Sequence, residues 1–250
     1  MINIIAFIPC HMASVRFPGK AMTKIKGYPM IEHVYRRAKL IEGLDDVIVT
    51  TCEDEIYNFC TINSIKVIKS SNSHKNGTTR VAESIDNFDF SHVLILQGDE
   101  PLINPIEINS FIEEIRNNNE IQAWNLITKL KNEYDMMDKT IVKCKLSENQ
   151  VIELFREKNE NFQNYFKILG IFCFTKQALV RYVNHSPCIK ESSLMIEQIR
   201  LLSNDIPLNV FKVNDFQGSI NTPQDKVKVI EILEKDLDQI ALFKKAFKIE

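Results

Sequence analysis

Residues 9–20 combine several side chains that bind phosphate. The segment reads PCHMASVRFPGK and carries a hydroxyl at Ser14, a guanidinium at Arg16, a Pro-Gly turn and an ammonium at Lys20. Backbone N–H groups near a glycine, an arginine fork and a lysine charge match the oxygens of a polyphosphate and the charge on a leaving pyrophosphate. A plain surface loop with two basic residues is the alternative. The position directly after an apolar run favours a polyphosphate loop, and the absence of GxxxxGK[ST] distinguishes it from a P-loop.

A second candidate site follows another apolar run. Residues 94–98 read LILQG, and Asp99 and Glu100 come directly after them. Carboxylates at the C-terminal end of a strand are well placed to hold Mg2+, which takes one or two protein oxygens together with substrate phosphates. A polar turn that ends a buried strand would show the same residues. Taken alone, the motif leaves both interpretations open.

Apolar runs and helical stretches alternate through the first hundred residues. Strand-like runs lie at 4–8, 47–51, 66–68 and 93–96, and helical spacing lies between them at 31–41 and 54–63. This alternation predicts a parallel, doubly wound sheet, whose ligands bind beyond the carboxyl ends of its strands. Both candidate loops follow such ends.

The pattern is more mixed from about residue 104. We expect a helix at 106–117, strands at 123–130, 141–145, 151–155 and 167–174, two further helices, and a last helix at 224–247. The fold class is therefore expected to be α/β, a three-layer α/β/α, Rossmann-like and mostly parallel sheet with a smaller mixed or antiparallel subdomain.

The composition is that of a globular protein and excludes several classes. The 250 residues are 44% hydrophobic and 26% charged, with a formal net charge of -2 and no Lys/Arg run, which argues against a nucleic-acid partner. Residues 1–8 lack a basic n-region and read as a buried strand, so we expect a cytoplasmic protein without membrane insertion. Six scattered cysteines without CxxC spacing predict reduced thiols.

Together the motifs resemble those of the CMP-Kdo synthetases, the 3-deoxy-manno-octulosonate cytidylyltransferases. The matching segments are 8–34, HKNGTTRVAE at 74–83, QGDEPLI at 97–103, LGIF at 169–172, MIEQIR at 195–200 and NTPQD at 221–225. They cover nearly the entire chain in the family's order. The resemblance implies a nucleotide-diphospho-sugar transferase-like fold, CTP and an acidic, Kdo-like sugar as ligands, Mg2+ as cofactor, and a homodimer.

The resemblance also implies a division of labour along one domain. Residues 1–103 would be the nucleotide-binding half, residues 104–215 the acceptor and dimerisation part, and residues 216–250 a metal loop and helix. The implied catalytic residues are Lys20, Arg16 and Asp99. The implied nucleotide-binding residues are Pro9, His11, Ser14, Arg16, Lys20, Gly77, Thr78 and Arg80. The implied sugar-binding residues are Gln97, His74, Arg156, Glu191, Glu197 and Gln198, and the implied metal ligands are Asp99 and Asn221.

Four positions depart from the family's pattern. His11 replaces an arginine of the phosphate loop, so a fixed positive charge becomes a group that is largely neutral at cytosolic pH. Asn221 replaces a second metal-binding aspartate, which keeps an oxygen but loses a charge. Ile168 stands where the family usually has a histidine, and a shortened polar loop follows Arg156. These changes predict a remodelled acceptor pocket.

The activity implied is transfer of CMP from CTP to the anomeric hydroxyl of a 2-keto-3-deoxy sugar acid, with release of pyrophosphate, for bacterial surface glycan or lipopolysaccharide biosynthesis. Kdo or a variant such as 8-amino-Kdo is the expected acceptor. Two alternatives remain open. One is a nucleotide- or sugar-binding homologue with impaired catalysis, suggested by His11 and Asn221. The other is a nucleotidyltransferase with a different acidic acceptor.

Overall fold

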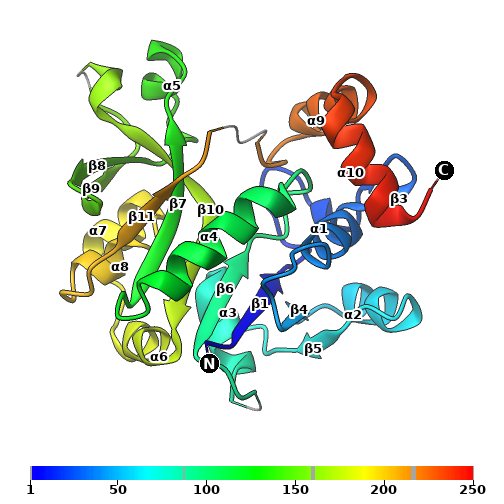
Figure 1. Cartoon of the computed structure of the whole chain (residues 1–250), viewed down its shortest axis with the longest axis horizontal. Helices are drawn as coiled ribbons and strands as arrows, with labels where there is room; N and C mark the ends of the chain where they lie inside the picture. Colours follow the sequence, from blue (N-terminus) through cyan, green and yellow to red (C-terminus); the bar gives the residue numbers. More distant parts are fainter. Residues whose placement is uncertain (1, 87, 159–160, 215–217, 250) are drawn as a thin grey trace.

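A single sheet runs through the molecule. The computed structural model describes residues 2–86, 88–158, 161–214 and 218–249. In these ranges nine strands lie in the order β5-β4-β1-β6-β10-β7-β11-β9-β8 (Figure 1). The four strands of the first half are β1 (Ile4–Pro9), β4 (Asp46–Thr51), β5 (Val67–Lys69) and β6 (His92–Leu96), and all are parallel. The expected parallel, doubly wound half is confirmed.

The second half of the sheet is mixed, as expected. Its strands are β7 (Ala123–Lys129), β8 (Lys143–Ser147), β9 (Gln150–Phe155), β10 (Phe166–Thr175) and β11 (Asn209–Lys212). Strand β10 is antiparallel to β6 on one side and to β7 on the other, and its first residues also pair with β8. Strand β11, which we did not predict, lies between β7 and β9.

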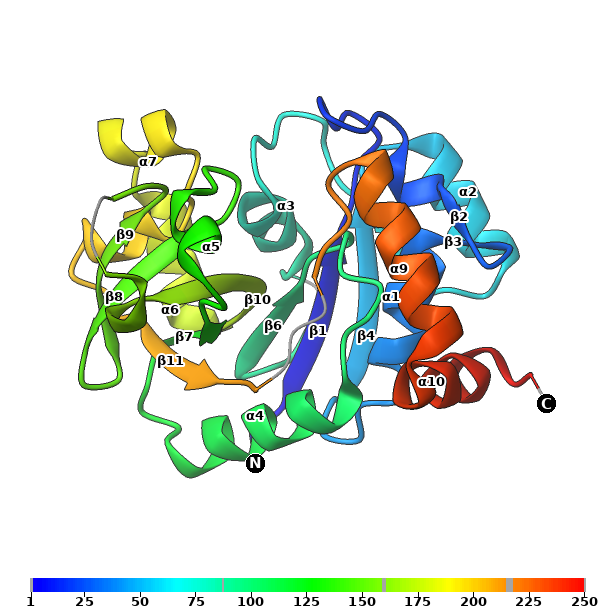
Figure 2. The ribbon, with the colours of Figure 1, turned by 90° about the horizontal axis from the view of Figure 1, so that it is seen from above.

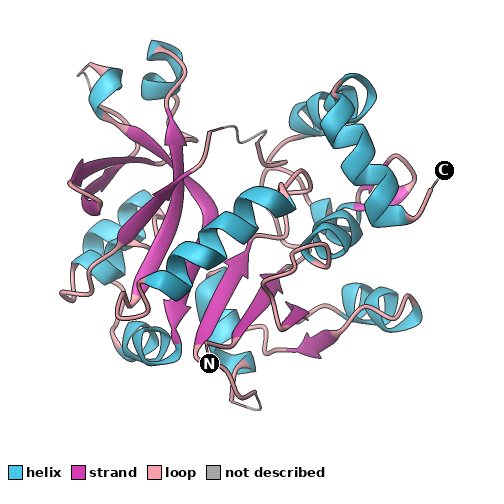
Figure 3. Cartoon of the chain, in the orientation of Figure 1, coloured by secondary structure: helices cyan, strands magenta, loops and turns pink. Residues whose placement is uncertain are grey.

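Helices cover both faces of the sheet and make three layers (Figure 3). The cause is visible in β1, where Ile4, Ala6 and Ile8 face one core and Ile5 and Phe7 face the other. The first core includes side chains from α1 (Met30–Ala38), α2 (Asp54–Ile62) and α4 (Pro105–Asn117). The second includes α3 (Gly77–Ser84), α6 (Lys176–Asn184) and α8 (Ile199–Leu202).

The molecule has two unlike ends (Figures 1 and 2). One end carries β8, β9 and the short helices α5 (Glu133–Met137) and α7 (Ile189–Leu194). The other end carries α9 (Pro223–Lys235), α10 (Leu237–Phe247) and a hairpin of β2 (Lys24–Ile25) and β3 (Tyr28–Pro29). Two 3-10 turns complete the elements, Lys20–Met22 and Phe162–Asn164. Three helices, α6 to α8, stand where we expected two.

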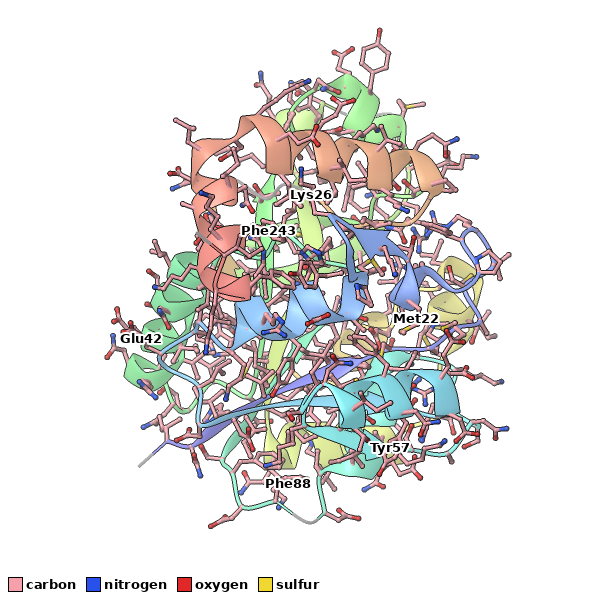
Figure 4. All side chains as sticks on the ribbon, turned by 90° about the vertical axis from the view of Figure 1, so that its right-hand side faces the viewer. Met22, Lys26, Glu42, Tyr57, Phe88 and Phe243 are labelled. Carbon is pink, nitrogen blue, oxygen red and sulfur yellow. The ribbon has the colours of Figure 1, made fainter. Side chains whose placement is uncertain are left out.

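The prediction of a single helix at 224–247 is wrong, because two helices occupy this range. The helix is interrupted at Asp236, whose extended backbone ends α9. The Asp236 side chain then caps α10, because it accepts a hydrogen bond from the Gln239 backbone N–H at 3.0 Å. The break turns α10 so that Phe243 stacks on His33 of α1. Figure 4 shows this side of the molecule, with Lys26 of the hairpin and Phe243 of α10 labelled. Continuous apolar periodicity concealed the break, because a cap residue can stand inside such a pattern.

None of the helices in the described ranges combines the length and the apolar character that a membrane crossing requires.

Candidate active site

The two candidate loops meet at the carboxyl edge of the parallel strands. Strands β1 and β6 are direct neighbours in parallel register, so the residues after Pro9 and after Leu96 emerge side by side. Gly98 lies close enough to the first loop that a side-chain carbon there would be 3.0 Å from the Pro9 carbonyl oxygen. The glycine therefore permits the close approach of the two loops.

Lys20 and Asp99 form the centre of this edge. The Lys20 ammonium donates to Asp99 Oδ2 at 2.6 Å, and both side chains are mostly buried. The same ammonium reaches the Ile220 carbonyl oxygen at 3.3 Å, and the Ile220 N–H donates to the Asp99 carbonyl at 2.8 Å. A third segment, just before α9, thus joins the two loops.

Asn221 brings this third segment to Arg16. The Arg16 guanidinium donates to Asn221 Oδ1 at 3.0 Å, and Asn221 Nδ2 donates to Ser219 Oγ at 2.9 Å. The nearby carboxylate of Asp225 is already used, because its Oδ2 accepts from the backbone N–H groups of Asn221 at 3.1 Å and of Thr222 at 2.9 Å. Asp225 and Thr222 form a capping box at the start of α9. Asp225 therefore orders the segment.

Two small cavities adjoin the loops on the side predicted to bind the nucleotide, and we call them the nucleotide-side cavities. One of about 110 Å3 is lined by Pro9, Cys10, His11, His74, Lys75, Asn76, Gly77, Arg80 and Gln97. One of about 60 Å3 is lined by Pro9, Cys10, His11, Lys20, Ala21, Met30, Gln97, Gly98 and Asp99. Most of the residues predicted to bind the nucleotide therefore surround one region. Ser14, Arg16 and Thr78 do not line these two cavities, although Thr78 directly follows Gly77 in the chain.

His11 differs electrostatically from the arginine it replaces. Desolvation of the ring, followed by the positive charges of Arg80 and Lys20, lowers its pKa from the ordinary value. The ring is therefore neutral at neutral pH, as the sequence predicted. It can accept or donate one hydrogen bond to a ligand but adds no fixed charge.

Arg80 and His74 hold the loop that precedes α3. The buried Arg80 donates to Ser70 Oγ at 2.6 Å and to the Ser71 carbonyl at 3.1 Å. His74 Nε2 contacts Glu83 and lies 3.2 Å from Ser71 Oγ. Both side chains still line the 110 Å3 cavity. His74, predicted to bind the sugar, thus lines the same small cavity as Arg80, predicted to bind the nucleotide.

A larger cavity of about 410 Å3 opens on the other side of Arg16 and Asn221. The residues that line it are Arg16, Glu100, Asp138, Thr140, Ile141, Val142, Lys167, Ile168, Leu169, Gly170, Gly218, Ser219, Asn221, Thr222, Asp225, Lys228 and Val229. Most of them come from the second half of the sheet and from the segment around the start of α9, and Arg16 and Glu100 come from the two candidate loops. The Ile168 side chain, found in place of a histidine, is one wall of this cavity. Its size suits a small polar molecule.

Glu100 is a site residue to which the sequence assigned no definite role. Its side chain is buried, Oε1 accepts the Gly170 N–H at 3.0 Å, and Oε2 is buried without a hydrogen-bond partner. Burial and then the neighbouring charge of Asp99 raise the pKa of Glu100 to about 8. The carboxyl is therefore mostly protonated at neutral pH. Its position directly after Asp99 was the sequence signal.

Four predicted sugar-binding residues, Arg156, Glu191, Glu197 and Gln198, belong to the half of the molecule built on the second half of the sheet. Glu191 is buried, and both of its oxygens accept from Arg200, at 2.5 and 2.9 Å. Arg156 donates to the carbonyls of Leu194, Met195 and Lys139 at 2.6 to 3.1 Å. These contacts give Glu191 and Arg156 structural partners, and neither side chain lines the described cavities.

Glu197 forms a contact between the two halves, and Gln198 forms one within the second half. Burial raises the pKa of Glu197, whose carboxyl lies against Thr78 of α3. Gln198 Nε2 donates to Asn125 Oδ1 at 3.2 Å. Asn125 is fully buried in β7 and was not predicted. A polar residue within the apolar run AWNLIT was the available signal.

Comparison with known proteins identifies the family. Residues 5–210 match the family model described as Cytidylyltransferase. The chain belongs to the cytidylyltransferase family. This cytidylyltransferase is 32% identical over 256 residues to the 3-deoxy-manno-octulosonate cytidylyltransferase of Thermodesulfovibrio yellowstonii, a match that covers 94% of this chain and 98% of the relative. It is 30% identical to the protein of the same name from Fusobacterium nucleatum, with 94% and 98% covered.

Solved structures support the same assignment. The fold of this cytidylyltransferase superposes on CMP:2-keto-3-deoxy-manno-octonic acid synthetase complexed with CTP with a TM-score of 0.87 at 26% identity, covering 94% of this chain and 100% of the other. The inositol-1-phosphate CTP transferase from T. maritima matches with a TM-score of 0.68 at 15% identity, which shows a shared fold. The expected family, fold class and enzyme type are confirmed.

Proposed function

We propose that this cytidylyltransferase transfers CMP from CTP to the anomeric hydroxyl of an acidic 2-keto-3-deoxy sugar and releases pyrophosphate. The observation that carries the proposal is the convergence of Lys20, Asp99, Arg16 and Asn221 between the nucleotide-side cavities and the 410 Å3 cavity. A reaction between a bound nucleotide and a bound acceptor needs such a junction. The names of the curated relatives supply the acceptor class.

The residues at the junction suit in-line displacement at the α-phosphorus. The acceptor hydroxyl forms a new oxygen–phosphorus bond and releases its proton to solvent as the bond to the pyrophosphate oxygen breaks. Arg16 and Lys20 bind the triphosphate, and Lys20 neutralises charge that develops on the α-phosphate. Catalysis then consists mainly of orienting two substrates and stabilising charge.

The oxygen atoms of Asp99 and Asn221 fit Mg2+, which prefers carboxylate and carbonyl oxygens beside substrate phosphates. In the described ranges no cluster of three His, Cys, Asp or Glu side chains is placed to hold a metal ion, so the substrate would complete the ligand set. A bound Mg2+ would polarise the phosphoryl oxygens. We propose Asp99 as its principal ligand.

The acceptor would occupy the 410 Å3 cavity. We propose that the sugar extends from this cavity towards Gln97, His74, Glu197 and Gln198, which do not line it, and that Arg156 and Glu191 support the surrounding segments. Ile168 removes a polar partner from this wall, so Kdo and an amino variant such as 8-amino-Kdo are both candidates.

The remaining expectations complete the proposal. We propose a cytoplasmic enzyme that acts in surface glycan or lipopolysaccharide biosynthesis, with the division at 103 and 215 into nucleotide, acceptor and C-terminal parts. A homodimer would form through the end that carries α5 and α7. Large apolar side chains are exposed there, namely Tyr134, Met137, Ile189 and Met195.

Pyrophosphate release tests the proposal directly. The enzyme is incubated with CTP and Mg2+, and Kdo and 8-amino-Kdo are offered in parallel. We expect release with at least one sugar and none above background with Asp99→Ala. Release with a different acidic acceptor or another nucleotide would replace the substrate assignment.

The Arg16–Asn221 pair favours a second candidate function, which is nucleotide or sugar binding without catalysis. An amide in place of a carboxylate lowers the negative charge at the metal site. A binding protein without catalysis would hold CTP yet release no pyrophosphate with any acceptor. Equilibrium CTP binding measured beside turnover separates the two functions.

A further inference from the structure

Strand β10 bulges where it passes the active site. Ile168 pairs with Ile127 of β7, but four residues later Phe172 pairs with Asn125, only two residues away in β7. Two extra residues therefore arch out of the ladder around Gly170. Leu169 and Gly170 at this arch line the 410 Å3 cavity.

The backbone groups of the arch find partners outside the usual strand ladder. The Gly170 N–H donates to Glu100 at 3.0 Å, and the Gly170 carbonyl accepts the Gln97 N–H at 3.2 Å. The carbonyls of Leu169 and Ile171 accept from Asn125 Nδ2 at 2.9 and 3.3 Å. Glu100 and Gln97 thus hold one side of the arch, and one buried amide holds the other.

Position 170 requires a glycine, because the partners of the arch lie too close for a side chain. A side-chain carbon at this position would lie 2.5 Å from Glu100 Oε1 and 2.8 Å from Gln97 Cγ. The arch therefore rests directly on the loop that carries Asp99. A displacement of the arch would move the wall of the cavity relative to that loop.

Asn125 also reaches a predicted acceptor residue. Its Oδ1 accepts from Gln198 Nε2 at 3.2 Å, while its Nδ2 donates to the arch. The side chain is fully buried, and every polar atom of its amide is used. One amide thus links the segment at 195–198 with the β10 arch.

We infer that Asn125 is a positioning residue for the acceptor, because it holds the β10 arch at the 410 Å3 cavity and also bonds Gln198, a proposed sugar contact. The inference rests on the proposed function. It separates acceptor recognition from nucleotide recognition, since Asn125 does not line the nucleotide-side cavities and its side-chain hydrogen bonds go to Leu126, Leu169, Ile171 and Gln198.

Two substitutions separate the two contacts of Asn125. Asn125→Ala removes both contacts. Asn125→Asp keeps an oxygen for Gln198 but replaces the donor to Leu169 and Ile171 by a second acceptor. Thr128→Val on the same strand is the matched control for a general disturbance of β7.

For each variant, the acceptor KM, kcat and the Kd for CTP without acceptor are measured. We expect Asn125→Ala to raise the acceptor KM by roughly tenfold or more, as displacement of a site wall does, with the CTP Kd unchanged within about twofold. Asn125→Asp should give a similar rise. Thr128→Val should leave the acceptor KM near the wild-type value.

Backbone hydrogen exchange gives a readout that does not depend on turnover. The Gly170 amide should exchange faster in both Asn125 variants than in wild type, and Gln198→Ala should raise the acceptor KM without that change. If Asn125→Ala is too unstable to purify, Asn125→Asp and Gln198→Ala decide the question.

Three results would overturn the inference. They are an acceptor KM unaffected in the Asn125 variants, an equal rise in Thr128→Val, and a parallel loss of CTP affinity. A wild-type enzyme that is silent with every sugar acid would overturn the proposed acceptor, and this inference with it. An active wild-type enzyme whose Asn125 variants keep an unchanged acceptor KM would overturn this inference alone.

Discussion

The ammonium of Lys20 lies 2.6 Å from Asp99 Oδ2, between the two loops that the proposed reaction requires. A divalent ion that binds Asp99 must compete with this ion pair, because both occupy the same carboxylate. When the phosphates of CTP arrive, they offer Lys20 another partner and release Asp99. Nucleotide and metal would therefore bind cooperatively.

Lys20→Met tests this competition. Without nucleotide, Mn2+ should bind the variant about tenfold more tightly than wild type, since the competing positive charge is gone. Electron paramagnetic resonance of free Mn2+ measures the affinity. Lys26→Met is the control, because Lys26 pairs with Glu234 away from the loops. Equal Mn2+ affinity in Lys20→Met and wild type would contradict the proposed competition.

Asn221→Asp should strengthen metal binding. A carboxylate beside Asp99 adds negative charge to a site that now has a neutral amide, so the Mg2+ concentration for half-maximal turnover should fall by roughly tenfold. The new charge should also hold Arg16 more tightly, and the CTP KM should change less than the Mg2+ requirement does. Asn63→Asp adds the same charge at an exposed helix end and should change neither value. An unchanged Mg2+ dependence would place Asn221 outside the metal site.

The Glu191–Arg200 pair should be important for stability. Glu191→Ala would leave the Arg200 guanidinium buried without its carboxylate partner, and such a loss costs about 3–5 kcal/mol. Glu231→Ala is the matched control, because its ion pair with Lys235 is exposed and worth about 0.5 kcal/mol or less. Urea unfolding measures both. Similar small losses in the two variants would refute the structural role assigned to Glu191.

His33 should make the stability depend on pH. Burial lowers its pKa from 6.5 to about 4, although Nε2 bonds the Ile25 carbonyl at 2.8 Å. The unfolded chain binds a proton near pH 6.5 and the folded chain does not, so this contribution is fully present above pH 6.5 and is lost as the pH falls towards 4. The loss should reach roughly 3 kcal/mol.

The comparison of His33→Gln with wild type isolates this effect. The variant should be less stable at pH 7 but should lose less of its free energy of unfolding between pH 6.5 and 4. His185→Gln, at an exposed position, should follow the wild-type pH dependence. Parallel pH profiles for His33→Gln and wild type would contradict the assignment.

The sequence predicted the parts of the site that depend on local pattern. Parallel strands end at one edge, so apolar runs followed by the loop at 9–20 and by Asp99 were enough to expect a shared site. Partners chosen by tertiary packing could not be predicted in this way. The pairing of Glu191 with Arg200 and the buried contacts of Asn125 depend on how helices and strands cross. The same limit concealed β11, whereas continuous apolar periodicity concealed the break at Asp236.

Lys20 and the Ile220 carbonyl are 200 residues apart in the chain, yet they are hydrogen-bonded at the reaction centre. During synthesis the loop at 9–20 and Asp99 leave the ribosome long before the segment that joins them. A nascent chain therefore has no complete catalytic centre, even after its first strands have paired. Loop closure over this distance makes the active centre one of the last features to form. Turnover would thus report that the whole chain has folded. A chain that misfolds near its C-terminal end would not turn over CTP.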